Sequence, residues 1–529
     1  MLRALENRLV WVARHKGFAI VLVGLISLAA RALLLPLLPI PKPAIQDEFS
    51  YLLASDTFAS GKLANPTPPL AEHFETLQEL MHPTYASKYP PLSGLMMALG
   101  QKITGEPWVG VWLSTGLLCA ALCWALQGWL PPVWAFAGSL LGLVRIGIVS
   151  YWTESYWGGT CAAIGGALMI GAVPRLMRRP RPGAATAFAA GLAILANTRP
   201  YEGLVLAMVC SAMPAFALAR RRFSISRLCR VVILPMALLL IPVFGWMGYY
   251  NYRVTHNALA IPYLVHDKQY VVRSPLLWQT EPNPATVYSS AVLKDFWTVA
   301  AANENQFARD HWLKAHVSDL ITLGHFFLGW PLVVLMIAFA RPLWRDPAAK
   351  CALVLAVGFY AGAAWDARLF PHYAAPATAL IYVLAACSLR AARNAWPGTF
   401  AERRYMTWGV LGLFALTTGM ALLTPENQYL FGPMDYHVRS KHASIAEQIE
   451  KNPGQHLVLV RYGTRHEMYE ELVFNRADID GSRVVWAHSL GPEKDRRLID
   501  HFPGRQVWLL EEDGDVKLTL STQLEAQRW

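Results

Sequence analysis

Long apolar runs recur along the chain, separated by short connectors rich in arginine and lysine. Many runs reach roughly 18 or more residues, enough for a helix to cross a bilayer core of about 30 Å. Of the 529 residues, 54% are hydrophobic and 16% are charged, whereas soluble proteins carry about a quarter charged residues. The 20 tryptophans fit the same class, because tryptophan collects at membrane interfaces. The sequence therefore predicts an α-helical polytopic membrane protein.

We expect about eleven membrane spans, chosen by window length and flanking charge. Their predicted cores are 17–38, 107–128, 133–150, 158–175, 184–198, 202–219, 231–250, 318–340, 350–365, 373–389 and 406–423. Basic residues cluster in connectors between them, where acids are scarce, so these connectors and the N-terminus are predicted to be cytoplasmic. The first span is too long for a signal-peptide core and is therefore predicted to be an uncleaved anchor.

The net charge of +11 is concentrated in these connectors. A nucleic-acid-binding protein would instead interleave basic and aromatic residues on a soluble face, so we expect no nucleic-acid partner. All seven cysteines lie in predicted spans or cytoplasmic connectors. Their positions indicate neither a disulfide framework nor a zinc site.

Three segments outside the predicted spans are substantial. Two are outer loops, 41–106 and 251–317, which belong to a transmembrane domain of residues 1–423. The third is the tail, 424–529, in which short β-rich runs alternate with polar, helix-favouring stretches. That alternation predicts a small α/β domain. With an odd number of spans, the tail lies outside the cytoplasm, on the same side as the two loops.

The first outer loop opens with "IQDEFSYLLASDTF", which begins at Ile45. The acids Asp47 and Glu48 come first, and apolar residues then recur at helical spacing. We expect an amphipathic helix lying in the membrane interface, whose aromatic and leucine side chains hold the acid pair at the surface. The simpler interpretation is that the two acids only cap the helix N-terminus.

Ionisable residues at the outer ends of spans are costly to hold near lipid, so they are functional candidates. We expect the fold to bring them together in one outward-facing cleft. Besides the acid pair, the candidates are Lys88 and Tyr89 in "KYPPL", Glu154 in "SYWTESYWGG", Arg199, Tyr201 and Glu202 in "NTRPYEG", and Asp366, Arg368 and His372 in "WDARLFPHYAAPA". The simpler interpretations are a lysine reaching from the interface to water, an Arg199–Glu202 ion pair, a solvated Glu154 and a hydrogen-bonded His372.

Acids beside cations at a membrane surface suit a reaction on a lipid-linked phosphate. Arginine and lysine neutralise the phosphate as it leaves, and a carboxylate removes the proton of the attacking hydroxyl. On these chemical grounds we assign Arg199 and Arg368 to the phosphate. The alternatives are an envelope-assembly scaffold and a transporter or flippase of a lipid-linked saccharide. A transporter would bury charges near the bilayer midplane and show matched, broken helices.

The acid pair, the helix after it, the "KYPPL" element before the second span and the outer C-terminal domain together resemble the GT-C glycosyltransferases. The likeness is to the protein O-mannosyltransferase and lipid A aminoarabinose transferase group, and it covers roughly residues 1–423. The resemblance implies a polyprenyl-phosphate sugar donor, inversion at the anomeric carbon and a lipid, glycan or protein acceptor. It also implies a bacterial inner membrane, with the C-terminal domain in the periplasm.

In that family an acid of the first outer loop is the catalytic base or positions the acceptor, which corresponds to Asp47, with Glu48 completing the pair. A lysine near a Pro-Pro element contacts the donor phosphate, which corresponds to Lys88. The first loop lacks an Asp-x-Asp pattern, and the spaced acids "DIDG" and "DGD" lie in the tail, where turn chemistry explains them. We therefore expect no required cofactor and no metal site, and a bound divalent cation is the less favoured alternative.

Overall fold

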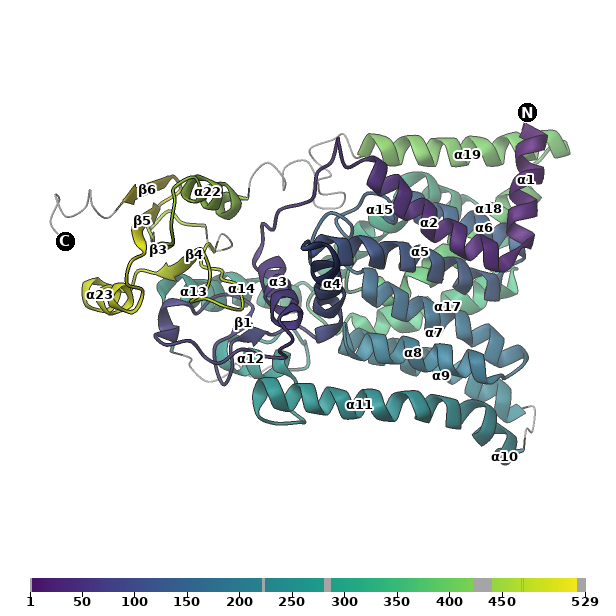
Figure 1. The fold of residues 1–529 in the computed structure, drawn as a ribbon. Coiled ribbons are helices and arrows are strands. Elements are labelled where there is room, and N and C mark those ends of the chain that lie inside the picture. The colour runs from purple at the N-terminus through teal and green to yellow at the C-terminus, as the bar shows by residue number, and fades with distance from the viewer. Residues whose placement is uncertain are drawn as a thin grey trace.

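The computed structural model describes residues 2–220, 224–279, 287–421, 440–467, 469 and 471–520. A bundle of long helices forms one part of the molecule, and a small sheet domain lies beyond one end of it (Figure 1). Segments of the two predicted outer loops lie between the bundle and the sheet domain. The N-terminus is at the opposite end of the bundle (Figure 1).

Within the described ranges, seven helical stretches are long and apolar enough to cross a membrane. They contain α2 (Lys16–Leu33), α5 (Trp108–Trp129), α7 (Thr160–Arg178), α9 (Pro200–Arg220), α11 (Leu234–Thr255), α15 (Trp312–Ala338) and α18 (Thr378–Ala395). Three shorter apolar helices accompany them: α6 (Pro132–Ile146), α8 (Pro182–Ala196) and α17 (Pro347–Ala363). The last predicted span holds α19 (Phe400–Ala421). Each of the eleven predicted spans thus contains a helix, and the number that cross a bilayer stays a prediction.

Short elements complete the bundle and its outer end. Around the bundle lie α1 (Leu2–Arg14), α10 (Ile225–Leu228), η2 (Cys229–Ile233), α16 (Ala340–Trp344) and η4 (Ala375–Ala377). The first outer loop contains α3 (Gln46–Ala59), η1 (Ala71–His73), β1 (Glu79–Leu80), β2 (Ala86–Ser87) and α4 (Pro91–Thr104). The second contains α12 (Pro262–Tyr270), α13 (Ala291–Asp295), η3 (Phe296–Ala300) and α14 (Ala301–Asp310).

The tail forms the predicted α/β domain. Its elements are α22 (Lys441–Glu450), β3 (His456–Tyr462), β4 (Val484–His488), α23 (Pro492–His501), β5 (Gln506–Glu512) and β6 (Val516–Leu520). The strands are ordered β4-β3-β5-β6, with β3 parallel to both of its neighbours and β6 antiparallel to β5. The predicted domain boundary at 424 lies outside the described residues and stays a prediction.

The two faces of this sheet have different partners. On one face, Val458 and Val460 pack against Ile445 and Ile449 of α22. On the other face, the alternate strand residues pack in one cluster with side chains of the first outer loop, among them Phe74. Because side chains alternate along a strand, β3, β4 and β5 each contribute both to the core of the domain and to its contact with the loop region.

Helix α3 confirms the helix predicted in the first outer loop, but apolar side chains that were expected to hold it in the membrane interface pack against protein instead. The Phe49 ring stacks on Phe474 of the C-terminal domain, with 4.2 Å between ring centroids. Leu53 belongs to the cluster shared with the sheet, and Phe58 packs against Tyr250 of α11. The helix is therefore enclosed by protein on several sides. Its apolar residues pack against the tail, a partner that periodicity alone does not identify.

Helix α15 is interrupted inside its span at Gly329, whose φ of 62° and ψ of 161° are not helical. Pro331 has no N–H, so the carbonyl of Phe327 loses its usual helical partner. The Tyr382 hydroxyl donates to that carbonyl at 2.8 Å, and Nε of the buried Arg145 donates to the preceding carbonyl at 2.9 Å. Protein groups therefore satisfy the broken backbone, as an interruption at membrane depth requires.

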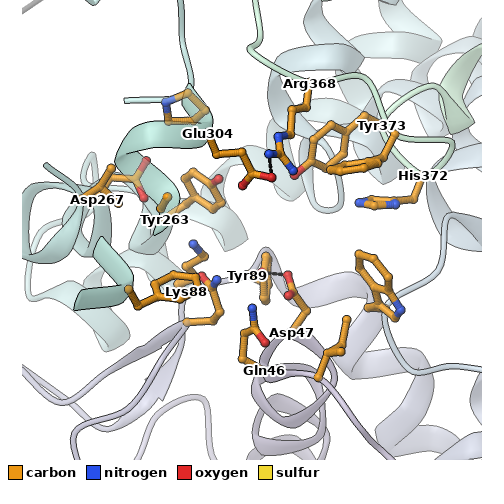
Figure 2. A pocket seen from close by; sticks show the side chains of 18 of the residues that line it. Gln46, Asp47, Lys88, Tyr89, Tyr263, Asp267, Glu304, Arg368, His372 and Tyr373 are labelled. Carbon is orange, nitrogen blue, oxygen red and sulfur yellow. Dashed lines mark hydrogen bonds and ion pairs between the residues drawn. The ribbon is translucent and has the colours of Figure 1, made fainter. Parts of the chain in front are cut away.

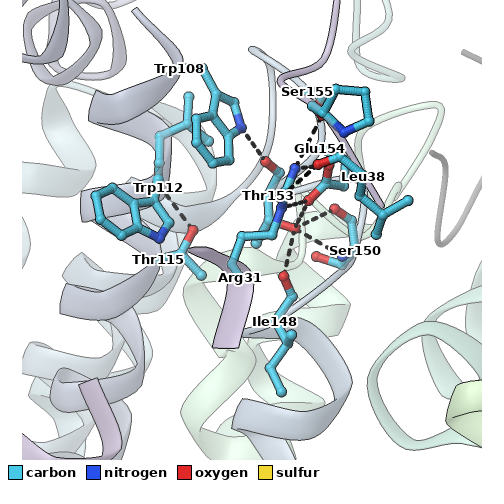
Figure 3. A network of polar contacts seen from close by, with 12 residues as sticks. Arg31, Leu38, Trp108, Trp112, Thr115, Ile148, Ser150, Thr153, Glu154 and Ser155 are labelled. Atoms are coloured by element: carbon cyan, nitrogen blue, oxygen red, sulfur yellow. Dashed lines mark hydrogen bonds and ion pairs between the residues drawn. The ribbon is translucent and has the colours of Figure 1, made fainter. Parts of the chain in front are cut away.

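Helix α2 carries Arg31 in its last turn, buried against Glu154 (Figure 3). Its Nε and Nη2 donate to the two carboxylate oxygens of Glu154 at 2.5 and 2.8 Å. The guanidinium also donates to the carbonyls of Leu38 and Pro39 and lies 4.8 Å from the Trp108 ring centroid. Both charged side chains are at most 1% exposed. Glu154 therefore holds α2 to the loop that follows α6.

Removing the charge of Glu154 with Glu154→Gln should lower the free energy of unfolding by about 3–5 kcal/mol, because the Arg31 guanidinium would stay buried without a counter-ion. The double variant Arg31→Met/Glu154→Met should restore most of the stability, since no buried charge remains. Denaturant unfolding in detergent micelles measures both effects. Equal stability of wild type and Glu154→Gln would contradict a structural role for the pair.

Candidate functional site

A cavity of about 900 Å³ lies where the helical bundle meets the two loops and the C-terminal domain. Its volume is within the range of small-molecule sites. Side chains reach it from α3, from the residues after β2, from α12 and α14, and from the segment before η4 (Figure 2). Seven predicted site residues line it: Asp47, Lys88, Tyr89, Arg199, Asp366, Arg368 and His372. The fold thus brings together residues from four separate parts of the chain.

Four predicted residues do not line this cavity. Glu154 is paired with Arg31 in the bundle. Glu202 is buried in the first turn of α9. The Tyr201 hydroxyl donates to the carbonyl of Gly362 at 2.6 Å, so it fastens α9 to α17. The fourth is Glu48.

The Glu48 carboxylate binds backbone rather than facing the cavity. Its Oε2 accepts from the N–H groups of Ala44 and Ile45 at 2.8 and 3.3 Å, and its Oε1 accepts from the N–H of Tyr156 at 3.0 Å. Burial raises the pKa of Glu48 to about 7, against the lowering effect of these hydrogen bonds. Successive residues of a helix point about 100° apart. Glu48 therefore does not form the predicted catalytic pair with Asp47.

Asp47 lies in the first turn of α3, on the cavity wall. The Tyr89 hydroxyl donates to its Oδ1 (Figure 2). Burial, followed by the Asp47 charge, raises the pKa of Tyr89 well above its usual range, so the phenol remains a donor. The Tyr89 ring stacks on Tyr51, with 4.4 Å between ring centroids. The stacked rings fix the hydroxyl and, through it, the orientation of the carboxylate.

Lys88, directly after β2, places its ammonium over three aromatic rings. Its Nζ lies 4.6 Å from the ring centroid of Tyr263, 5.5 Å from that of Tyr89 and 5.6 Å from that of Trp297. Burial lowers the pKa of Lys88, opposed chiefly by the charge of Asp267. Within the part of the chain that the structure describes, the ammonium has no hydrogen bond or ion pair to protein. It is therefore a desolvated cation held mainly by aromatic faces.

Arg199, between α8 and α9, is the second such cation. Its guanidinium carbon lies 4.2 Å from the ring centroid of Tyr373, and no hydrogen bond or ion pair engages it among the described residues. A cation–π contact covers the flat face of a guanidinium and leaves its N–H edges to other partners. Two cations of this kind in one cavity suit the binding of an anion such as a phosphate.

Arg368 differs, because it is ion-paired with Glu304 of α14 (Figure 2). Its segment is held against the second outer loop, since the N–H of Ala367 donates to the carbonyl of Pro275 at 2.8 Å. Arg309, also in α14, donates to three carbonyls of the same loop. Arg368 and Glu304 therefore belong to one connected unit, and Arg368 is less suited to a phosphate than the two unpaired cations.

Asp366 and His372 line the cavity mainly as hydrogen-bonding groups. Burial, followed by the charge of Glu202, raises the pKa of Asp366 to about 8. The Nδ1 of His372 lies 2.9 Å from the Tyr151 hydroxyl. Burial, followed by the charge of Arg199, lowers the pKa of His372 well below its usual range. Both side chains are therefore predominantly uncharged near neutral pH.

The sequence did not reveal the contribution of the second outer loop. Tyr263 and Asp267 reach the cavity from α12, and Glu304 reaches it from α14 (Figure 2). Tyr263 and Asp267 are four residues apart and so share a helix face, which is a recognisable signal. No pattern in the sequence marks Glu304, and none connects this loop with Asp47.

Among the described residues, no group of three or more histidine, cysteine, aspartate or glutamate side chains is arranged to hold a metal ion. The expectation that no cofactor is required stays a prediction.

No family model matches the chain, and no curated protein matches it. Solved structures with a similar arrangement include ArnT from Cupriavidus metallidurans bound to undecaprenyl phosphate. The two are 14% identical, with a TM-score of 0.49, over 93% of this chain and 92% of ArnT.

The oligosaccharyltransferase of Archaeoglobus fulgidus is also similar in structure. Its complex with Zn and sulfate is 11% identical, with a TM-score of 0.49, over 93% of this chain and 67% of that chain. The enzyme, AglB, in complex with an inhibitory peptide and a dolichol-phosphate, is 12% identical with a TM-score of 0.46. At this level of identity the likeness assigns neither an activity nor a substrate to the chain.

Proposed function

We propose that the protein is a glycosyltransferase that moves a sugar from a polyprenyl phosphate to an acceptor hydroxyl outside the cytoplasm. The observation that carries the proposal is one cavity lined by Asp47, Lys88 and Arg199, in which neither cation has an ion pair within the described residues. A carboxylate beside two anion-seeking cations matches the demands of displacing a phosphate with a hydroxyl. The cavity lies at one end of the bundle of apolar helices, where a donor anchored in the membrane by its lipid chain could reach it.

In the proposed reaction, the acceptor oxygen attacks the anomeric carbon from the side opposite the phosphate, which inverts the configuration. Asp47, oriented by Tyr89, accepts the proton of the attacking hydroxyl. The bond between the anomeric carbon and the phosphate oxygen breaks, and its electron pair stays with the polyprenyl phosphate. Lys88 and Arg199 stabilise the negative charge that develops there.

The proposed partners are a hexose or pentose linked to a polyprenyl phosphate, a lipid, glycan or protein acceptor, and the surrounding membrane lipid. We place the protein in a bacterial inner membrane, with the cavity and the C-terminal domain on the periplasmic side. A lipid phosphate is also bound in the ArnT and AglB structures. The proposal nevertheless rests on the cavity of this chain.

Asp47→Asn should reduce release of free polyprenyl phosphate by about a hundredfold to ten-thousandfold, because the general base is lost while the shape of the cavity is kept. The assay gives purified protein in lipid a panel of polyprenyl-phosphate sugars with mixed acceptors. Asp310→Asn is the matched control, since Asp310 is exposed at the end of α14 and does not line the cavity. This control should retain wild-type turnover.

Two outcomes would contradict the proposed function. Full turnover by Asp47→Asn would show that Asp47 is not the general base. Absence of release from every donor, together with passage of lipid-linked sugar across vesicle membranes, would establish a transporter in place of a transferase.

The affinity for a polyprenyl phosphate should fall as pH rises, because only the protonated Lys88 ammonium attracts the phosphate. Burial lowers the pKa of Lys88, so the fall should begin below the usual range of lysine. Lys88→Arg should abolish this fall, because a guanidinium stays protonated. Lys88→Met should weaken binding by about tenfold to a hundredfold near neutral pH, the loss of one charge-assisted hydrogen bond. Calorimetric titration in nanodiscs across the pH range measures the affinity of wild type and both variants. If the affinity of Lys88→Arg still falls with pH as in wild type, the titrating group is not Lys88.

A further inference from the structure

Gln78 has an uncommon backbone conformation on the wall of the cavity. Its φ is 65°, in the left-handed region, where a β-carbon lies too close to the following carbonyl oxygen. Among the described residues, two other non-glycine residues share this region: Leu70, which packs beside the sheet, and His256, which ends α11. Of the three, only Gln78 lines the cavity. Strained backbone of this kind clusters at binding and catalytic sites.

The residues around Gln78 hold this conformation in place. Its carbonyl accepts from the Ser50 hydroxyl of α3 at 2.7 Å and from the N–H of Lys88 at 3.3 Å. Leu77, the preceding residue, is 0% exposed and packs with residues of the second outer loop, and the following residue begins β1. The backbone is therefore fixed on both sides of Gln78, and it is bound to the elements that carry Asp47 and Lys88.

The side-chain amide of Gln78 is not engaged by the protein. The residue is only 8% exposed. Its amide oxygen is buried without a hydrogen-bond partner, and its amide nitrogen has no partner either within the described residues. A buried amide without partners is unfavourable, and most such groups in folded proteins are hydrogen-bonded. The nitrogen therefore keeps its N–H donors for a group inside the cavity.

Gln78 lies directly opposite Lys88 across the hairpin of β1 and β2. The register pairs Glu79 with Ser87, so the residues next to them, Gln78 and Lys88, face each other and share a backbone hydrogen bond. Both side chains line the cavity. An ammonium group supplies charge with little directional preference, whereas an amide N–H supplies a directed hydrogen bond without charge. The two groups therefore complement each other in binding one anion.

We propose that Gln78 binds the donor phosphate, with its amide N–H donating to a phosphate oxygen whose charge Lys88 neutralises. This inference rests on the proposed function. Glycine adopts a left-handed conformation without steric cost, so the backbone alone does not explain a glutamine at this position. A hydrogen bond to the phosphate gives the amide the partner that the protein does not supply.

Gln78→Ala and Gln78→Gly both remove the amide and keep the carbonyl that binds Ser50 and Lys88. Each should weaken the binding of a polyprenyl phosphate by about tenfold to a hundredfold, as expected for the loss of a hydrogen bond to a charged group. The two variants differ only in the β-carbon. Gln78→Gly should therefore unfold at a higher temperature than Gln78→Ala, the reverse of the usual order. Calorimetric titration and thermal unfolding of the full-length protein in nanodiscs measure the two effects.

His256→Gly is the matched control, because His256 is also left-handed but is exposed and does not line the cavity. This variant should bind a polyprenyl phosphate as wild type does. Wild-type affinity in both Gln78 variants would overturn the inference.

A double-variant cycle with Lys88→Met separates direct contact from an effect exerted through Lys88. If the amide contacts the phosphate, Gln78→Ala should weaken binding further in the Lys88→Met background. If Gln78 only positions the ammonium, the second substitution would have no further effect, and that result would also overturn the inference.

The same titrations distinguish this inference from the proposed function. Absence of polyprenyl phosphate binding by wild type would refute the donor class of the proposed function. Binding by wild type that the Gln78 variants match would refute the role of Gln78 alone.

Discussion

A charge held beside lipid has to be stabilised by a protein group, and this requirement separates the ionisable side chains of the bundle into two kinds. Glu154 pairs with Arg31, and Arg145 binds the carbonyls freed at a kink, so these charges maintain the helix packing. Lys88 and Arg199 are held over aromatic rings instead. An aromatic face stabilises a cation by about 0.5–2 kcal/mol without engaging its N–H groups. The two cations thus keep donors for an anion, which distinguishes the cavity from the structural ion pairs.

The C-terminal domain is part of the same arrangement rather than an appended module. In an open α/β sheet, ligands usually bind beyond the carboxyl ends of the parallel strands. Here that edge faces the first outer loop: His488 ends β4 and contacts the carbonyl of Glu75. The place where a soluble α/β domain would bind a small molecule is therefore an intramolecular contact. The same loop carries Lys88, so the domain is connected to the cavity through a few residues.

Much of this architecture is predictable from the sequence, because its determinants are local. Apolar runs mark the helices of the bundle, and alternation of strand-like and helix-like stretches marks the tail domain. The convergence of Asp47, Lys88 and Arg199 is also predictable, since all three lie in connecting segments predicted to be on the same side of the membrane. Each of these patterns can be recognised in a short stretch of sequence, given the thickness and polarity of the bilayer.

The choice among neighbouring groups is not local, and there the sequence misleads. Asp47 and Glu48 are adjacent carboxylates that the sequence cannot tell apart. In the helix, Asp47 lines the cavity, whereas Glu48 accepts hydrogen bonds from backbone N–H groups. The aromatic residues of α3 have the spacing of an interfacial helix, but Phe474 of the tail covers one of them. Periodicity identifies which side of a helix is buried and cannot identify the partner. Glu304 illustrates the same limit, because its partner Arg368 comes from another part of the chain.

The pairing of Arg31 with Glu154 has a consequence for how the protein is made. The two residues are 123 positions apart, so at about 5–20 residues per second a ribosome needs roughly 6–25 s to add the acid after the arginine. During that interval the Arg31 guanidinium lacks its carboxylate partner. Arg31 lies in the last turn of α2, where a long side chain can extend toward the helix end and water meanwhile. The first predicted span therefore reaches its final packing only after the segment that follows α6 has been synthesised.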